Sequence, residues 1–125
     1  MKMLIVDDST VMQRKIQRSI ALDAITDFFT ASNGVEAIEI FKQQQPELVT
    51  MDLTMPEMDG VECVKHLIAI NPDALVLVIS SLSDKATTIQ AMKNGAKGFL
   101  TKPFDDDQLN AAIEQLLEEA QSDAS

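Results

Sequence analysis

Polar residues that could carry out chemistry follow four short apolar runs of this sequence. Asp7 and Asp8 come after the first run, Asp52 after another, and Ser80 and Lys102 after the last two. Three carboxylates within a few ångström repel one another unless one is protonated or a cation joins them, and their hard oxygens suit Mg²⁺. A metal and a lysine on opposite sides of a transferring phosphoryl group would supply most of what phosphoryl transfer needs. These residue types therefore indicate a magnesium-dependent phosphoryl-transfer site.

Asp52 is the best candidate for the nucleophile of such a site. It stands alone at the end of its apolar run, whereas Asp7 and Asp8 form a pair suited to holding the metal. A carboxylate in this setting can form an aspartyl-phosphate. Each residue also has a simpler role, because acidic pairs often cap helices and most lysines lie at the surface. The chemical interpretation therefore depends on a fold that brings all of them to one place.

The elements that must position these residues alternate regularly between strand and helix. The apolar runs predict five strands, at residues 3–6, 28–31, 48–52, 74–79 and 98–101. Helical spacing follows each run, with helix starts near Ser9 or Asp8, Asn33, Asp59, Ser83 or Asp84, and Asp105. The third of these helices should run from about 60 to 70, and the last should open with a capping box over residues 105–108.

Strict strand–helix alternation predicts a doubly wound α/β fold, a five-stranded parallel sheet with helices on both faces, since parallel neighbours need long crossovers. In such sheets ligands bind beyond the carboxyl ends of the strands, where the strand order reverses. The acids, Ser80 and Lys102 all follow strand ends. The predicted fold thus gathers them at one edge of the sheet.

Composition restricts the classes of function. The 125 residues suit one domain, which we place at residues 1–121 with a frayed tail at 122–125. A net charge of -10 disfavours direct binding to nucleic acid or to anionic lipid. Cys63 is the only cysteine, which excludes an internal disulfide. No apolar run approaches the roughly 18 residues of a spanning helix, so we expect a soluble, cytoplasmic protein without membrane insertion.

Four motifs, in order along nearly the whole chain, resemble those of response-regulator receiver domains of the CheY-like kind. They are Leu-Ile-Val-Asp-Asp-Ser at 4–9, Asp52 with Met-Pro-Glu-Met-Asp-Gly at 55–60, Ser80, and Lys-Pro-Phe at 102–104. The resemblance implies the strand order 2-1-3-4-5 and a cis bond between Lys102 and Pro103. It also implies that Asp52 accepts phosphate from the phosphohistidine of a histidine kinase or a histidine phosphotransfer domain.

The same resemblance assigns roles around the nucleophile. It implies that Mg²⁺ is held by Asp8, Asp52 and the backbone carbonyl of Thr54, while Asp7 acts through water. Ser80 is expected to bind a phosphoryl oxygen and Lys102 to pair with the phosphate.

The family's switch couples an inward movement of Ser80 to rotation of an aromatic residue on the fifth strand, here Phe99 where many members carry tyrosine. Output is then expected in trans from the face formed by the fourth helix, the fifth strand and the last helix. Because the last helix is acidic, a downstream protein partner should present basic or apolar residues. We expect the unphosphorylated protein to be a monomer that catalyses only its own phosphoryl acceptance and dephosphorylation.

Several alternatives remain open from the sequence. A role in chemotaxis is plausible, because single-domain receivers often serve there. The chain could equally be a phosphorelay intermediate, a phosphate sink or a piece of a longer regulator. A Mg²⁺-dependent phosphatase with an aspartyl nucleophile would carry Asp-x-Asp after its first strand, whereas Asp7 and Asp8 are adjacent. A flavodoxin-like cofactor binder would need hydrogen-bond donors to the flavin phosphate where this chain has the acidic Asp8. We expect no cofactor besides Mg²⁺.

Overall fold

The computed structural model describes residues 1–53, 60–81 and 85–124, with side chains described through residue 121. Its five strands all pair in parallel, in the order β2-β1-β3-β4-β5. The strands are β1 (Lys2–Val6), β2 (Asp27–Ala31), β3 (Leu48–Asp52), β4 (Leu75–Ser81) and β5 (Gly98–Lys102). The helices are α1 (Thr10–Ser19), α2 (Gly34–Gln44), α3 (Gly60–Ile70), α4 (Lys85–Lys93) and α5 (Asp106–Ala124). The predicted fold class and strand order are confirmed.

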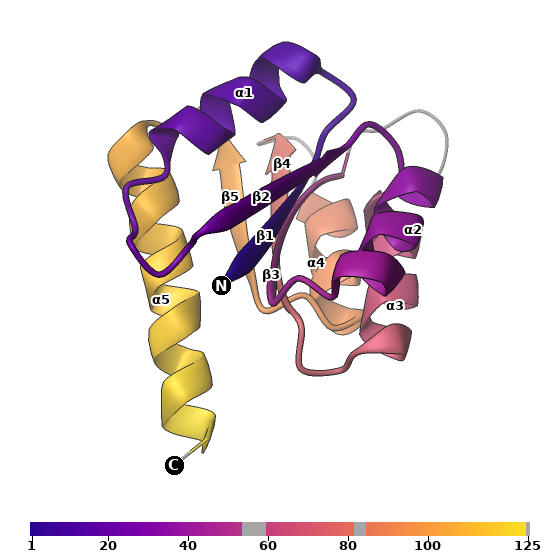
Figure 1. The fold of residues 1–125 in the computed structure, drawn as a ribbon. Helices are drawn as coiled ribbons and strands as arrows, with labels where there is room; N and C mark the ends of the chain where they lie inside the picture. Colours follow the sequence, from indigo (N-terminus) through magenta and orange to yellow (C-terminus); the bar gives the residue numbers. More distant parts are fainter. Residues whose placement is uncertain (54–59, 82–84, 125) are drawn as a thin grey trace.

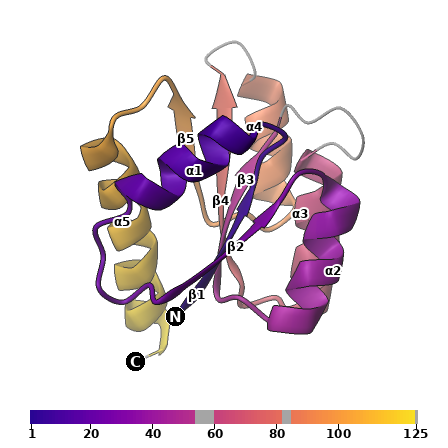
Figure 2. The same cartoon turned by 45° about the horizontal axis from the view of Figure 1, so that its top comes forward.

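The sheet lies between two layers of helices. Helices α1 and α5 cover one face, and α2, α3 and α4 cover the other (Figures 1 and 2). Alternate residues of β1 enter opposite cores: Met3 and Ile5 pack with the α1/α5 layer, while Leu4 and Val6 pack with the other. The central strands are therefore buried on both sides, which is why they read as continuous apolar runs.

The element boundaries follow the sequence signals with small differences. Strand β4 continues to Ser81, beyond its predicted end at residue 79, because Ser80 and Ser81 pair with Thr101 and Lys102 of β5. Helix α5 continues to Ala124, so the helical backbone extends past residue 121 into the segment that we expected to fray. The predicted helix starts at Asp59 and at Ser83 or Asp84 lie outside the described residues.

The start of α5 carries the predicted capping box. The Asp105 carboxylate accepts a hydrogen bond from the Gln108 amide at 2.8 Å, and the Gln108 side-chain oxygen accepts one from the Asp105 amide at 2.9 Å. Loss of such a cap costs about 1 kcal/mol. We expect Asp105→Ala to lower the free energy of unfolding by about that amount in urea denaturation. Glu118→Ala, on the exposed part of the same helix, is the control, and an equal loss there would show that the cap contributes nothing of its own.

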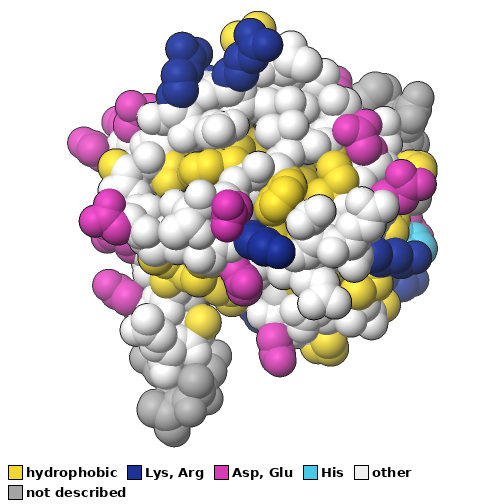
Figure 3. All heavy atoms as spheres, in the orientation of Figure 1, with side chains coloured by type: hydrophobic (Ala, Val, Ile, Leu, Met, Phe, Trp, Pro, Cys, Tyr) yellow, Lys and Arg dark blue, Asp and Glu magenta, His cyan; other side chains and the backbone are white. Residues whose placement is uncertain are grey.

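Charge is unevenly spread over the surface. Basic side chains gather over α1, at the top of Figure 3, and acidic ones lie along α5. The α1 residues concerned are Arg14, Lys15 and Arg18, all exposed.

Among the described residues no helix combines the length and the apolar character that crossing a membrane requires.

Candidate functional site

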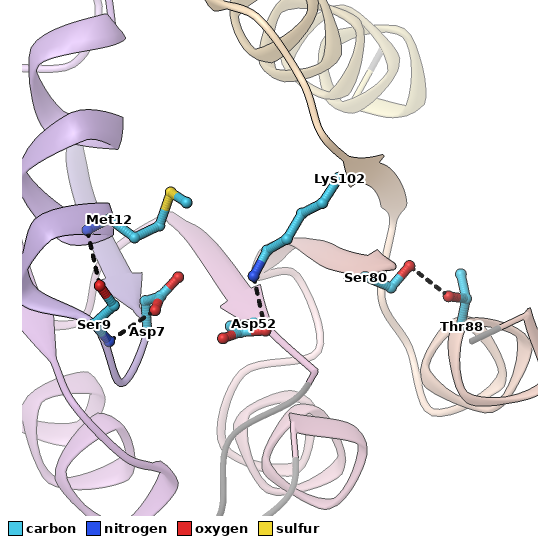
Figure 4. A network of polar contacts seen from close by, with 7 residues as sticks. All are labelled: Asp7, Ser9, Met12, Asp52, Ser80, Thr88 and Lys102. Carbon is cyan, nitrogen blue, oxygen red and sulfur yellow. Dashed lines mark hydrogen bonds and ion pairs between the residues drawn. The ribbon is translucent and has the colours of Figure 1, made fainter. Parts of the chain in front are cut away.

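The carboxyl ends of β1, β3, β4 and β5 bring together side chains that are far apart in the sequence (Figure 4). Asp7, Asp52 and Ser80 are each only 2% exposed, although two of them are carboxylates. Buried carboxylates are uncommon unless they are paired or bind a metal. The edge of the sheet predicted from the sequence is thus an unusually polar and buried place.

Three acids form a cluster at this edge. Ligand oxygens of Asp7, Asp8 and Asp52 all lie within 4.8 Å of one another, and Asp8 is exposed to solvent. One Asp7 oxygen, Oδ1, accepts a hydrogen bond from the Ser9 amide at 2.9 Å. The other, Oδ2, is buried with no hydrogen-bond partner among the described residues. An oxygen in that position fits a cation or its hydration water, so the donor set suits Mg²⁺.

Burial raises the pKa of Asp7 above its ordinary value of 3.8. The charges of Asp52 and Asp8 raise this pKa further, while the Ser9 amide and the Lys102 ammonium oppose the change. Burial is the largest of these effects. The cluster therefore holds its negative charge at an energetic cost, which a cation would offset.

Lys102 approaches the cluster from β5. Its Nζ lies 3.6 Å from Asp52 Oδ1, and its side chain is 31% exposed. The two residues belong to strands separated by β4, so only the folded sheet brings them together. The peptide bond between Lys102 and Pro103 is cis, as the resemblance implied.

Ser80 lies at the same edge, but its hydroxyl is turned away from Asp52 (Figure 4). Ser80 Oγ accepts a hydrogen bond from Thr88 Oγ1 of α4 at 2.8 Å.

Phe99, the predicted aromatic switch residue, is 55% exposed on β5 and is not a core residue here. The rotation of the Phe99 side chain on phosphorylation stays a prediction.

Two residues that shape the site had no role in the sequence analysis: Gln13 was not singled out, and Gly60 appeared only as part of a motif. Gln13 is buried on α1, where its amide donates hydrogen bonds to the carbonyls of Asp7 at 2.7 Å and Ala31 at 3.2 Å. Gln13 thereby ties the ends of β1 and β2 to α1. The sequence signal that could have identified it is a polar residue between the inward-facing Met12 and Ile16.

Gly60 matters by its size, because a Cβ there would lie 2.5 Å from the Asp52 carbonyl oxygen. Any side chain at this position would push the start of α3 away from Asp52.

The remaining predicted ligand, the backbone carbonyl of Thr54, lies outside the described residues. Its role on the metal stays a prediction, as do the catalytic and switch roles of Asp52, Lys102, Ser80 and Phe99.

Comparison with known proteins agrees with this geometry. The family model for the response regulator receiver domain matches residues 3–114. The chain is 37% identical over 115 residues to the chemotaxis protein CheY of Thermotoga maritima, covering 92% of this chain and 96% of that protein.

Solved structures show the same fold. The receiver domain of AraT, a response regulator from Geobacillus stearothermophilus, superposes with a TM-score of 0.89 at 25% identity, over 99% of this chain and 98% of that one. NtrX from Brucella abortus has a TM-score of 0.90 at 25% identity over 98% of this chain, which spans only 28% of the longer NtrX chain. The chain therefore belongs to the response regulator receiver family, as a CheY-like signalling protein of two-component systems rather than a conventional enzyme.

Proposed function

We propose that Asp52 accepts a phosphoryl group from the phosphohistidine of a histidine kinase or histidine phosphotransfer domain, in a reaction that depends on Mg²⁺. The observation that carries the proposal is a carboxylate only 2% exposed, held between two further acids and the Lys102 ammonium. A structural carboxylate has no need of two acidic neighbours, which only add repulsion.

Each residue has a distinct task in this proposal. Asp8, Asp52 and the Thr54 carbonyl would hold the metal, and Asp7 would hold its hydration water. An Asp52 oxygen forms the bond to phosphorus as the bond from phosphorus to the donor imidazole nitrogen breaks, and the freed imidazole takes up a proton. Bound Mg²⁺ would neutralise the charge on the phosphoryl oxygens during transfer. Lys102 leaves Asp52 to pair with the phosphate, and the acyl phosphate later hydrolyses, so the modified state is temporary.

Phosphorylation by a small donor tests the metal requirement directly. We expect wild-type protein incubated with acetyl phosphate and Mg²⁺ to gain the mass of one phosphoryl group, because the metal offsets the repulsion between the acids and the incoming phosphate. With EDTA in place of Mg²⁺ the gain should fall to the background seen without donor. Intact-mass measurement gives both results, and equal labelling with EDTA would contradict the metal requirement.

The output surface that we propose lies on α4, β5 and α5. A groove of about 560 Å³ between α4 and β5 is lined by the apolar side chains of Ile89, Met92 and Phe99, together with Lys85 and Lys93. Helix α5 beside it is acidic. This supports a partner that inserts apolar side chains into the groove and presents basic groups to α5.

The pathway is a separate proposal. Relatives of nearly the same length are named chemotaxis protein CheY, which favours chemotaxis over a phosphorelay intermediate or a phosphate sink. The receiver match over most of the chain favours a switch over a phosphatase. A cytoplasmic location and a monomeric unphosphorylated state stay predictions.

A further inference from the structure

The hydrogen bond between Thr88 and Ser80 connects α4 directly to the phosphorylation site. Thr88 Oγ1 donates to Ser80 Oγ at 2.8 Å, the usual distance for a hydrogen bond between two hydroxyls. Ser80 is 2% exposed, so water has little access to replace this bond. Figure 4 shows the Ser80 hydroxyl directed toward Thr88 and away from Asp52.

The direction of the hydroxyl matters because a serine side chain occupies one of three staggered rotamers. Ser80 and Asp52 lie at the ends of adjacent strands, with Asp52 paired to Ile79, the residue before Ser80. A rotamer that turns Oγ toward a phosphoryl group on Asp52 must turn it away from α4. The bond to Thr88 and a bond to the phosphoryl oxygen therefore exclude each other.

We propose that Thr88 is a positioning residue that holds the Ser80 hydroxyl in the unphosphorylated orientation, so that phosphorylation must break the bond between Thr88 and Ser80. This inference rests on the proposed function of Asp52 and extends it to α4. Breaking the bond removes one contact of the Thr88 side chain at the groove that Ser80, Thr88, Ile89, Met92 and Phe99 line together. The proposed output surface would then respond to the site through two hydroxyls, without requiring the tyrosine hydroxyl that Phe99 lacks.

The energetic consequence has a definite sign. Removing the Thr88 hydroxyl leaves the buried Ser80 oxygen without this donor in the unphosphorylated state, whereas the phosphorylated state does not contain this bond. The equilibrium should move toward the state in which Ser80 faces Asp52. A typical hydrogen bond corresponds to a change of about 2- to 10-fold in the equilibrium constant.

The test uses beryllofluoride, which mimics a phosphoryl group on aspartate, in the presence of Mg²⁺. Thr88→Val keeps the side-chain shape and removes the hydroxyl, and we expect it to bind beryllofluoride about 2- to 10-fold more tightly than wild type. Thr88→Ser retains the donor and should restore wild-type affinity. Thr87→Val, one residue away on the same helix, is the matched control and should bind as wild type does.

Two further measurements separate positioning from a merely structural effect. In a Ser80→Ala background Thr88→Val should change the affinity by less than about twofold, because the acceptor is already gone. NMR three-bond couplings should show the Ser80 χ1 populations shifted by Thr88→Val in the protein without beryllofluoride. The role of Thr88 would be overturned, with that of Asp52 left intact, if Thr88→Val changed the beryllofluoride affinity equally in the Ser80→Ala background. Unshifted Ser80 χ1 populations together with unchanged affinity would have the same meaning. Wild-type protein that binds no beryllofluoride would overturn the assignment of Asp52 as well.

Discussion

Asp52→Asn should abolish labelling by acetyl phosphate. The amide that replaces the carboxylate is a poor nucleophile and carries no charge for the metal or for Lys102, whose Nζ lies 3.6 Å from Asp52 Oδ1. Intact-mass measurement in Mg²⁺ should show one added phosphoryl group on wild type and only background on the variant. Because the side chain keeps its shape, the fold should persist, which circular dichroism can check.

A control substitution is available on the same chain. Asp23 is an exposed aspartate between α1 and β2, remote from the carboxyl ends of the strands. Asp23→Asn should be labelled like wild type. Equal labelling of wild type and Asp52→Asn would remove Asp52 from the nucleophile's role and leave the acidic cluster without its proposed chemistry.

Asp7→Asn should change stability and metal affinity in opposite directions. Without divalent metal it removes a buried charge from a cluster of three acids, so we expect the free energy of unfolding to rise. The same change should weaken Mg²⁺ binding by about 10- to 100-fold, the usual cost of losing a group that supports the metal through water. Urea denaturation in EDTA and a Mg²⁺ titration measure the two effects.

Asp8→Asn is the matched comparison, since Asp8 belongs to the same cluster but is exposed. It should weaken Mg²⁺ binding while leaving the metal-free free energy of unfolding nearly unchanged, because water already solvates its charge. An unchanged Mg²⁺ titration for both variants would contradict the assigned ligand set.

The stability gain of Asp7→Asn should depend on pH in a definite direction. The pKa of Asp7 is raised in the folded protein above its ordinary value of 3.8. Below that value Asp7 is protonated in both states, so the charge costs nothing. As the pH rises further, the unfolded chain releases this proton first, and the wild type loses stability relative to the variant until the folded-state pKa is passed. A difference in unfolding free energy that shrinks with rising pH in EDTA would contradict this account.

Much of the fold could be predicted because its signals are local. The apolar runs at β1 and β3, the cap at Asn33 and the capping box at Asp105 each depend on residues within a few positions. The strand β4 was predicted two residues short because Ser80 and Ser81 have no strand signal of their own. They are held in the sheet by their pairing with Thr101 and Lys102 of β5, which lie twenty-one positions further along the chain.

The sequence by itself determined which side chains could meet. Strand–helix alternation makes the sheet parallel, and a parallel sheet places Asp7, Asp52 and Lys102 at one edge. Only the tertiary structure decided how they meet: that Asp7 is buried while Asp8 is exposed, that Gln13 ties β1 to β2, and that Ser80 faces Thr88. The physical reason is that burial and rotamer choice depend on neighbours from distant segments, which no local pattern of residues specifies.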